Sequence, residues 1–438
     1  MNARNRNLLF AGLMLVAFAA AGYKILKHPA GSGSGFAVAV AKTELPTFKP
    51  ALQAPQFDAQ FVSSNPGQAV HAPSIVELRD GGLRAVWFSG SREGAGDVTI
   101  QTAIMNVATG QWGAEATLFS RPQLQRSLQR YIKKIGNPVI ARASDGSLHL
   151  WMVNVSLGGW AGSAITWSWS EDDGASWSQP KRLVTSPFLN ISTLVKGAPV
   201  AMTNGQISLP VYHEFVTKFA EVLRLGQDGK VIDKVRIPAS QTSLQPVVLA
   251  NSAQFAQAFM RAGRGGQVMT SQTQDAGRTW SDAASLPIPN PDSALAGITL
   301  QNGESWLALN PTQAGREKLA LVSANQPSLS VAVEPLSPQQ SQARPLSIKD
   351  HEAALSVELK AKGVSDSDIK AYVASARKQL CGEANCVQEF SYPFLLQSRD
   401  GMLHLVYTWN RSRIKYMRFD PSALPTSASS AAKANGGN

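Results

Sequence analysis

The chain has very few cysteines, because Cys381 and Cys386 are the only two among its 438 residues. Two thiols alone make a poor metal site, and no histidine lies close to them in the sequence to complete one. In an exported protein such a pair is expected to form a disulfide that closes a small loop. We therefore expect a disulfide here, no metal and no other cofactor.

Acidic residues are also few relative to basic ones. The 30 Asp and Glu against 41 Lys and Arg give a net charge of +11 and a pI of about 9.7. This balance suits nucleic acid, anionic lipid or an acidic polysaccharide as a partner. The sequence contains no zinc-knuckle spacing, no base-reading basic helix and no RNP-type strand. Nucleic acid is therefore the least favoured of the three.

Long apolar runs are lacking beyond the N-terminus, where residues 8–21 follow Arg4 and Arg6. We expect a membrane anchor that crosses over residues 8–26 with the arginines inside; a signal peptide cleaved within residues 1–28 is the alternative. Either form places the body in the bacterial cell envelope, anchored to the inner membrane and periplasmic, or secreted. Residues 29–60 are rich in Gly, Ala, Ser and Pro and are expected to be a flexible tether.

Two segments share the pattern Ser/Thr-x-Asp-x-Gly-x-Ser/Thr-Trp, at residues 170–177 and 273–280. The Asp can accept hydrogen bonds from amides of a tight turn, the Gly supplies positive φ, and the hydroxyl adds a local hydrogen bond. The Trp can pack the turn onto the next strand. Two copies between β-like segments indicate a repeated hairpin.

A longer repeat consists of a Pro or small residue, an apolar run, a turn and a second apolar run. Asp-Gly or Asn-Gly pairs between the runs are strong hairpin signals. Six copies, mostly 47 to 65 residues apart, predict an all-β, six-bladed β-propeller of four-stranded blades, with five or seven blades as the alternatives. The copies begin at Pro73, Pro138, Pro199 and Pro393, and more weakly near Pro246 and Leu295.

The eight-residue motif is the Asp-box, or BNR repeat, of the sialidase (neuraminidase) superfamily, which the chain resembles from about residue 65 to 420. The resemblance implies a six-bladed propeller, here residues 61–420, in which the Asp-box lies between the third and fourth strands of a blade. Degenerate copies are expected at residues 106–112 and 323–330. The Asp-box itself is structural, so it predicts the fold and not the chemistry.

Two insertions interrupt the repeats. Residues 120–136 combine basic and apolar residues at the spacing of a short amphipathic helix, which is either a solvated face or a positive lip beside the site. Residues 335–389 contain a helical segment, a helix from Ser365 to about Leu380, and the cysteine loop, and they precede the last blade. The Ser/Ala-rich tail, residues 421–438, is expected to be disordered.

Chemistry is expected where the inner strands of a propeller begin, because polar groups converge there on a central pit. In sialidases the first repeat opens with an Arg, the first of three that hold a carboxylate, and Ala72 takes that position here. The adjacent His71 is either an acid/base or substrate ligand, or a structural histidine. Asn137 also begins an inner strand, and we expect it to bind substrate.

The loop of residues 91–97 matches the place from which sialidases supply an acid/base Asp, which points to Asp97. A carboxylic acid in a partly buried pit can have its pKa raised enough to protonate a leaving oxygen. Arg92 would then hold an acidic sugar or fix Asp97. The alternative is that Asp97 caps the next strand and that Arg92 pairs with Glu93.

Arg261 and Arg316 match the second and third carboxylate-binding arginines of sialidases, unless they are ordinary surface residues. Tyr392 opens the last repeat, where sialidases carry the nucleophile. A phenol needs a base to act in this way. Gln245 replaces the Glu that provides it in sialidases, and Gln cannot take a proton.

Glu214, His213 or His71 could replace the missing base. The alternative is that Tyr212 belongs to the core and that His213 and Glu214 are ordinary loop residues. Trp409 ends the last hairpin and would either stack on a sugar ring or belong to the blade core.

Together these residues predict an exported, sialidase-like glycoside hydrolase (exo-alpha-sialidase-like) acting on an anionic oligo- or polysaccharide. Tyr392 would attack or stabilise the anomeric carbon, Asp97 would be the acid/base, and the arginines would hold the acid group. Ala72 and Gln245 favour a different acidic or deoxy sugar over sialic acid. The alternatives are a polysaccharide lyase on a uronate-containing glycan, a non-catalytic carbohydrate-binding envelope protein, and a propeller that binds protein.

Overall fold

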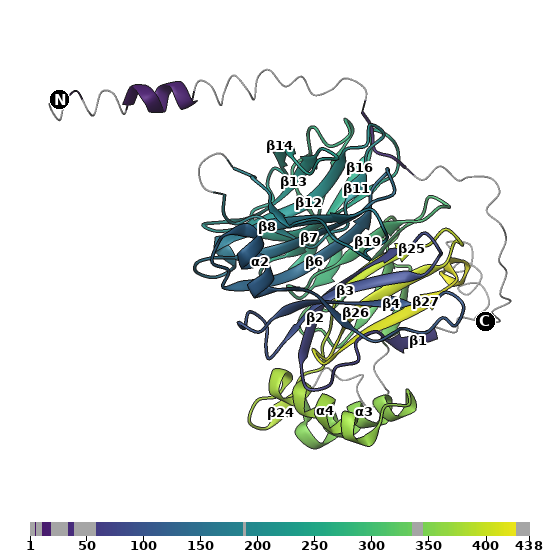
Figure 1. Ribbon diagram of the computed structural model, residues 1–438. Helices are drawn as coiled ribbons and strands as arrows, with labels where there is room; N and C mark the ends of the chain where they lie inside the picture. The colour runs from purple at the N-terminus through teal and green to yellow at the C-terminus, as the bar shows by residue number, and fades with distance from the viewer. Residues whose placement is uncertain are drawn as a thin grey trace, which may run out of the picture.

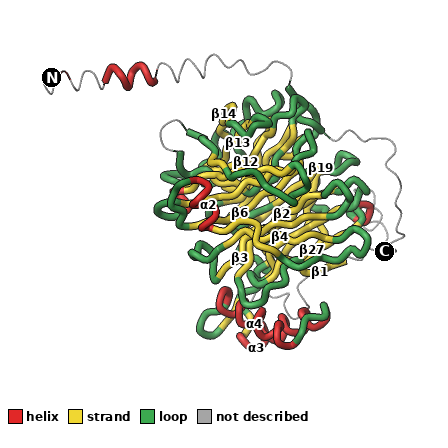
Figure 2. The backbone as a smooth tube through the Cα atoms, in the orientation of Figure 1, coloured by secondary structure: helices red, strands yellow, loops and turns green. Residues whose placement is uncertain are grey.

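The computed structural model describes residues 5, 11–18, 34–38, 58–186, 190–334 and 345–425. Six antiparallel sheets form a six-bladed β-propeller, which confirms the fold that the repeats predict (Figure 1). Strands dominate the body, and the longer helices gather at one edge (Figure 2).

Each blade uses consecutive strands, with one exception in the last blade. The first blade contains β2 (Ala69–Glu77), β3 (Leu83–Gly90), β4 (Thr99–Met105) and β5 (Ala116–Ser120); the second contains β6 (Lys134–Arg142), β7 (Leu148–Val155), β8 (Ser163–Ser170) and β9 (Lys181–Arg182). In the third, β10 (Leu194–Val195) and β11 (Val200–Ala201) both pair with β12 (Ile207–Glu214), followed by β13 (Lys218–Leu225) and β14 (Val231–Arg236). The fourth contains β15 (Ser243–Ala250), β16 (Ala256–Ala262), β17 (Gly266–Thr273) and β18 (Ala284–Asn290); the fifth contains β19 (Ala296–Thr299), β20 (Ser305–Leu309), β21 (Leu319–Ser323) and β22 (Ser330–Glu334). The sixth combines β25 (Phe390–Gln397), β26 (Leu403–Trp409) and β27 (Arg413–Phe419) with β1 (Asp58–Phe61).

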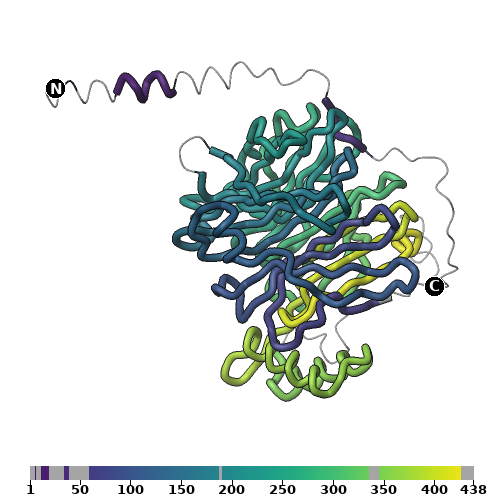
Figure 3. The backbone as a smooth tube through the Cα atoms, in the orientation of Figure 1, coloured from purple at the N-terminus to yellow at the C-terminus, as the bar shows by residue number. Residues whose placement is uncertain are grey.

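The first strand of the propeller body closes the ring, because β1 pairs antiparallel with β27 and so completes the last blade (Figure 3). The prediction of one continuous tether over residues 29–60 is therefore wrong at its end. It is also wrong at residues 34–38, where the Phe36 amide donates to the Ala253 carbonyl at 2.7 Å. The Phe36 side chain is 1% exposed and packs with Met202 and neighbouring apolar residues. The segment is thus held by a buried aromatic ring together with backbone hydrogen bonds.

Both Asp-boxes have the hydrogen bonds that their residue types predict, and each lies between the third and fourth strands of its blade. In the first, Asp172 accepts from the Ser176 amide at 2.9 Å and from its hydroxyl at 2.6 Å. In the second, Asp275 accepts from the Thr279 amide and hydroxyl at the same two distances. The glycine of each box has positive φ, as the turn requires. The motif therefore stabilises the turn locally.

The insertion before the last blade consists of β23 (Leu346–Ser347), α3 (Ile348–Ala361), α4 (Asp366–Leu380) and β24 (Asn385–Cys386). Cys381 and Cys386 form the expected disulfide. A buried ion pair attaches α3 to the blades, since the Lys415 ammonium lies 2.6 Å from Glu358 and also bonds to Glu334. The helix predicted within residues 120–136 is α2 (Arg121–Leu128), which begins with a capping box at Ser120.

The ends of the chain differ in part from their predictions. Leu424, which follows the short helix η2 (Pro421–Ala423), is 5% exposed and packs in the core, so the predicted disordered tail is wrong at its beginning. Most of the expected anchor lies outside the described residues. Within it, residues 11–18 are described and are helical. In the part of the chain that the structure describes, no helix combines the length and apolar character needed to span a membrane.

Candidate active site

Four inner strands begin with the same irregularity. The register of β2, β6, β15 and β25 shifts at a residue with positive φ that precedes a proline. Proline cannot donate to the strand ladder, so the chain bulges there, and bulges commonly redirect side chains. Positive φ in residues other than Gly is uncommon and concentrates at functional sites. The four residues are Ala72, Asn137, Gln245 and Tyr392, with φ of 53°, 44°, 49° and 53°.

Side chains from several blades form a hydrogen-bonded cluster around Tyr392. The Gln245 amide Nε2 donates to the Tyr392 hydroxyl at 3.1 Å and to the Tyr212 hydroxyl at 3.4 Å. Arg261 Nη1 donates to Gln245 Oε1 at 3.0 Å and to the Tyr392 hydroxyl at 3.5 Å. Asn137 Nδ2 reaches the Tyr212 hydroxyl at 3.4 Å. These residues come from the second, third, fourth and sixth blades, so they define the centre of the site.

His71 lies against this cluster rather than in open solvent. Its ring is 3% exposed and is 4.2 Å from the Tyr392 ring and 5.6 Å from the Phe88 ring, measured between centroids. Among the described residues, none hydrogen-bonds its Nδ1 atom. Burial holds the pKa of His71 well below its ordinary value, and the positive charges of Arg411, Arg316, Lys196 and Arg261 lower it further. The imidazole is therefore neutral and surrounded by cations.

Two acidic side chains connect three arginines beside the cluster. Glu389 lies 3.2 Å from Arg316 and 2.9 Å from Arg411. Asp292 accepts from Arg261 Nε at 2.6 Å, and its backbone carbonyl accepts from Arg316 at 3.0 Å. Burial alone would raise the pKa of Glu389, but the two arginines outweigh it and the pKa is lowered. Glu389 is therefore ionised and holds two guanidinium groups in place.

Arg411 is a candidate that the sequence motifs missed. Its carbonyl accepts from the Val70 amide at 3.0 Å, so its backbone lies beside the start of β2, close to Ala72. Asn410 and Arg411 both have positive φ, and they form the turn between β26 and β27. In the sequence, the only signal for Arg411 is its place in the turn of the last hairpin, which lies at the same end of the strands as Tyr392. Arg411 supplies a third guanidinium near the position where the resemblance expects the first Arg.

The loop of residues 91–97 reaches the arginines through a different acid from the one expected. Glu93 lies 3.0 Å from Arg411. Asp97 is exposed and, within the described residues, its carboxylate bonds only to the Ser91 amide and hydroxyl, each at 3.0 Å. Arg92 is also exposed. In the described residues Glu93 therefore pairs with Arg411, and not with Arg92 as the alternative interpretation expects, while Asp97 caps its own loop.

Two further ionisable groups surround the cluster. The Lys196 ammonium donates to the Pro393 carbonyl at 2.8 Å and lies 5.9 Å from the Tyr392 ring centroid. Burial lowers the pKa of Lys196 to about 7. Burial also raises the pKa of Glu214, with Asp292 adding to the effect and Arg261 opposing it. Glu214 shares a face of β12 with Tyr212, because side chains alternate along a strand.

Two expected substrate ligands are not part of the cluster. His213 lies between Tyr212 and Glu214 on β12 and therefore faces the other way, where its ring stacks on Phe219 at 4.5 Å. Trp409 is 1% exposed and packs edge-on against Phe61 at 5.2 Å. It therefore belongs to the core of the last blade. The prediction that Trp409 contacts a substrate is therefore wrong, whereas contact through the half-buried His213 stays a prediction.

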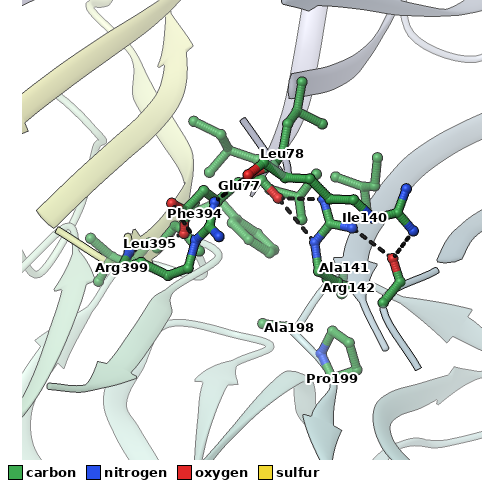
Figure 4. Close-up of a pocket in the computed structure, with 15 residues that line it drawn as sticks. Glu77, Leu78, Ile140, Ala141, Arg142, Ala198, Pro199, Phe394, Leu395 and Arg399 are labelled. Carbon is green, nitrogen blue, oxygen red and sulfur yellow. Dashed lines mark hydrogen bonds and ion pairs between the residues drawn. The ribbon is translucent and has the colours of Figure 1, made fainter. Parts of the chain in front are cut away.

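The opposite end of the inner strands opens into a pocket of about 410 Å³ (Figure 4). Three arginines line it, and each is already engaged. Arg142 donates to the Glu77 and Gly146 carbonyls, and Arg399 bonds to the Glu77 carboxylate at 3.0 Å. Arg79 donates to the Gly146 carbonyl at 2.9 Å and pairs with Asp173. These arginines join blades, so the chemistry is expected at the Tyr392 end.

Comparisons with known proteins agree with this geometry. The model of the BNR repeat-like domain family matches residues 81–405. A Hadza microbial sialidase is similar at a TM-score of 0.57 and 14% identity, covering 82% of this chain and 66% of that one, so the chain spans about two thirds of its length. An intramolecular trans-sialidase from Ruminococcus gnavus, solved with oseltamivir carboxylate, is similar at a TM-score of 0.57 and 11% identity, covering 84% of this chain and 96% of that one. The NanB sialidase from Streptococcus pneumoniae is similar at a TM-score of 0.59 and 11% identity, covering 84% of this chain and 71% of that one. No curated protein sequence matches the chain.

Proposed function

The chain belongs to the BNR repeat-like domain family, and from this premise we propose that it is a glycoside hydrolase that acts on a sugar carrying a carboxylate. The observation that carries the proposal is the contact of Tyr392 with Arg261 and Gln245 inside a ring of cations. Guanidinium groups are well suited to bidentate recognition of a carboxylate. The sialidase fold of the solved structures supports the reaction class.

In the proposed reaction, Tyr392 attacks or stabilises the anomeric carbon, and Arg261, Arg316 and Arg411 hold the acid group of the sugar. The leaving oxygen takes a proton from a carboxylic acid of the 91–97 loop, for which Asp97 and Glu93 are the candidates. As Tyr392 attacks, its phenol proton passes to Glu214, whose pKa burial raises. Water then attacks the anomeric carbon and gives a proton to the carboxylate of the loop, while Glu214 returns its proton to the Tyr392 oxygen as the bond to the sugar breaks.

The proposed sugar is acidic or deoxy and different from sialic acid. Ala72 replaces the Arg of the first repeat, and Gln245 replaces the expected Glu base. Arg411 supplies a guanidinium from another direction, which would present the carboxylate differently. We also propose export to the cell envelope, which the basic and apolar N-terminus and the Cys381–Cys386 disulfide support.

The proposal is tested by a glycan hydrolysis screen of the full chain beside Tyr392→Phe and Arg261→Ala. Both variants are expected to lose turnover by about 100-fold or more. Tyr392→Phe should keep its melting temperature, whereas Arg261→Ala should also lower it, because Arg261 pairs with Asp292. Tyr131→Phe and Arg264→Ala are matched controls, because both residues are exposed and outside the cluster. Full activity of Tyr392→Phe would refute the assignment, and binding without turnover by the wild type would indicate a carbohydrate-binding protein.

A second candidate function is a lyase that acts on a uronate-containing glycan, and Gln245 favours it. A lyase neutralises the uronate carboxylate with arginine and amide groups while a Tyr or His removes the C5 proton, so it needs no carboxylate base in the position of Gln245. The neutral His71 and the amides of Asn137 and Gln245 fit this arrangement. An unsaturated product that absorbs in the ultraviolet would separate it from hydrolysis.

A further inference from the structure

The insertion contains a buried histidine whose polar atoms have no evident use. His351, on α3, is fully buried, and no described residue hydrogen-bonds either of its ring nitrogens. An imidazole N–H or lone pair left without a partner in the interior costs free energy. A bound water or ion is one explanation for a buried polar group in this condition. The surroundings of His351 show which ligand would suit it.

The two cysteines lie beside this ring. A ligand atom of His351 and the two Sγ atoms of Cys381 and Cys386 all lie within 4.8 Å of one another. Among the described residues, this is the one group of three His, Cys or acidic side chains close enough to share a metal ion. Cysteines five positions apart and a histidine 30 residues before the first give no local motif, so the sequence offered no signal for the group.

We propose that, when the disulfide is reduced, His351, Cys381 and Cys386 bind a thiophilic divalent cation such as Zn²⁺. Two thiolates and one imidazole are a ligand set that Zn²⁺ accepts, with water in the fourth position of a tetrahedron. The disulfide and the metal are alternatives, because a sulfur held in a disulfide is not a thiolate. The insertion thus has an oxidised, disulfide form and a reduced, metal-bound form.

The conversion balances with a thiol reductant. Two electrons from a dithiol cleave the Cys381–Cys386 bond, the dithiol becomes a disulfide, and both cysteines gain protons. Binding of Zn²⁺ then releases two protons as the thiols become thiolates, while neutral His351 donates its lone pair. No other co-reactant is required.

The location gives this switch a route to the candidate site. The disulfide joins only residues at the end of α4 and in β24, whereas the metal would also hold α3 through His351. Three residues after Cys386, Glu389 holds Arg316 and Arg411. The metal-bound form would therefore fix the segment that leads into this ion pair. The inference does not depend on the proposed function, because metal binding is measured without turnover.

The test uses the full chain. The free thiols of the purified protein are counted first. The protein is then reduced and titrated with Co²⁺, which serves as a spectroscopic substitute for Zn²⁺. Reduced wild type is expected to bind one ion with thiolate-to-cobalt charge-transfer absorption, and the oxidised chain is expected to bind none at this site. His351→Ala is expected to weaken binding by more than the 10–100-fold that loss of an outer-sphere partner costs. His351→Cys, which keeps a ligand, should restore it, and His213→Ala is the matched control.

Absence of the charge-transfer absorption in the reduced wild type would overturn the proposal. So would His351→Ala binding Co²⁺ as tightly as the wild type, since the two cysteines alone would then account for the site. Circular dichroism of each reduced variant checks that the fold is kept, and His351→Cys decides the outcome if His351→Ala does not fold.

Discussion

Glu389 offers a direct measure of how strongly the arginine cluster is held together. Its side chain is 10% exposed and lies 3.2 Å from Arg316 and 2.9 Å from Arg411. Glu389→Gln keeps the shape but removes the charge, which leaves two guanidinium groups without their shared counter-ion. Glu93→Gln is the matched control, because Glu93 lies 3.0 Å from the same Arg411 but is 38% exposed.

The two substitutions should differ clearly in their effect on the free energy of unfolding. Removing one partner of a buried ion pair costs about 3–5 kcal/mol, and the retained amide oxygen points to the lower end. An exposed pair contributes about 0–1 kcal/mol. At roughly 2.1 cal/mol/K per residue over about 370 residues, 1 kcal/mol corresponds to about 1.3 °C. The melting temperature should therefore fall by about 4 °C for Glu389→Gln and by about 1 °C or less for Glu93→Gln.

The pH dependence provides an independent check on the same carboxylate. The folded-state pKa of Glu389 is lowered: burial opposes this, but Arg411 and Arg316 outweigh burial. A carboxylate of this kind stabilises the fold above its unfolded pKa of about 4.5, and the contribution is lost as the pH falls through the folded pKa. Denaturant unfolding of wild type and Glu389→Gln should differ by a constant amount above about pH 5.5 and converge in more acidic solution. Equal and small effects of the two substitutions at neutral pH would refute the reasoning.

Three other perturbations test separate parts of the structure. Gln245→Glu gives Tyr392 a proton acceptor, so kcat/KM for hydrolysis should rise at least tenfold. A lyase that uses the amide should instead lose activity. An unchanged rate would contradict both the hydrolase and the lyase roles of this position. Phe36→Ala should cost about 3 kcal/mol in denaturant unfolding, against almost nothing for the exposed Val107→Ala, if residues 34–38 belong to the body. Lys196→Met should be more stable than the wild type near pH 6, because burial lowers the folded pKa of Lys196 to about 7. The free-energy cost of burying the charged ammonium is fully present below pH 7 and disappears as the pH rises toward 10.5. Parallel unfolding curves at all pH values would contradict the assigned burial.

The parts of the fold that sequence could predict are those determined within a few residues. An Asp-Gly pair between apolar runs specifies a hairpin locally, and so does the Asp-box, in which Asp172 and Ser176 bond within one turn. Because these units repeat, the ring of blades follows from counting them. The closure by β1 does not follow, since its pairing with β27 joins the two ends of the body and leaves no local signal.

The site divides in the same way. Asn137 was identifiable because it begins an inner strand, and Gln245 and Tyr392 were identifiable because the resemblance to sialidases marks their positions in the repeats. Glu389 and Arg411 act through contacts between segments, so neither has a motif. The error at Trp409 had a different cause, because a tryptophan at the end of a hairpin can stack on a sugar or pack inside the blade, and the sequence does not distinguish the two.

The departures from the sialidase pattern also differ from each other in weight. A guanidinium on a long side chain can reach one point from several backbone positions, and Arg411 begins beside the start of β2, where Ala72 lies. His71 lies within the electrostatic reach of Arg411, Arg316, Lys196 and Arg261, so the positive field around Tyr392 is kept without the Arg of the first repeat. Among the described residues, Gln245 has no such substitute in direct contact, because the groups that bond to the Tyr392 hydroxyl there are an amide and a guanidinium. Both can donate a hydrogen bond to a phenolate, and neither can take the proton of a phenol. The reaction class therefore depends on where the Tyr392 proton goes, far more than on whether an acidic sugar can bind.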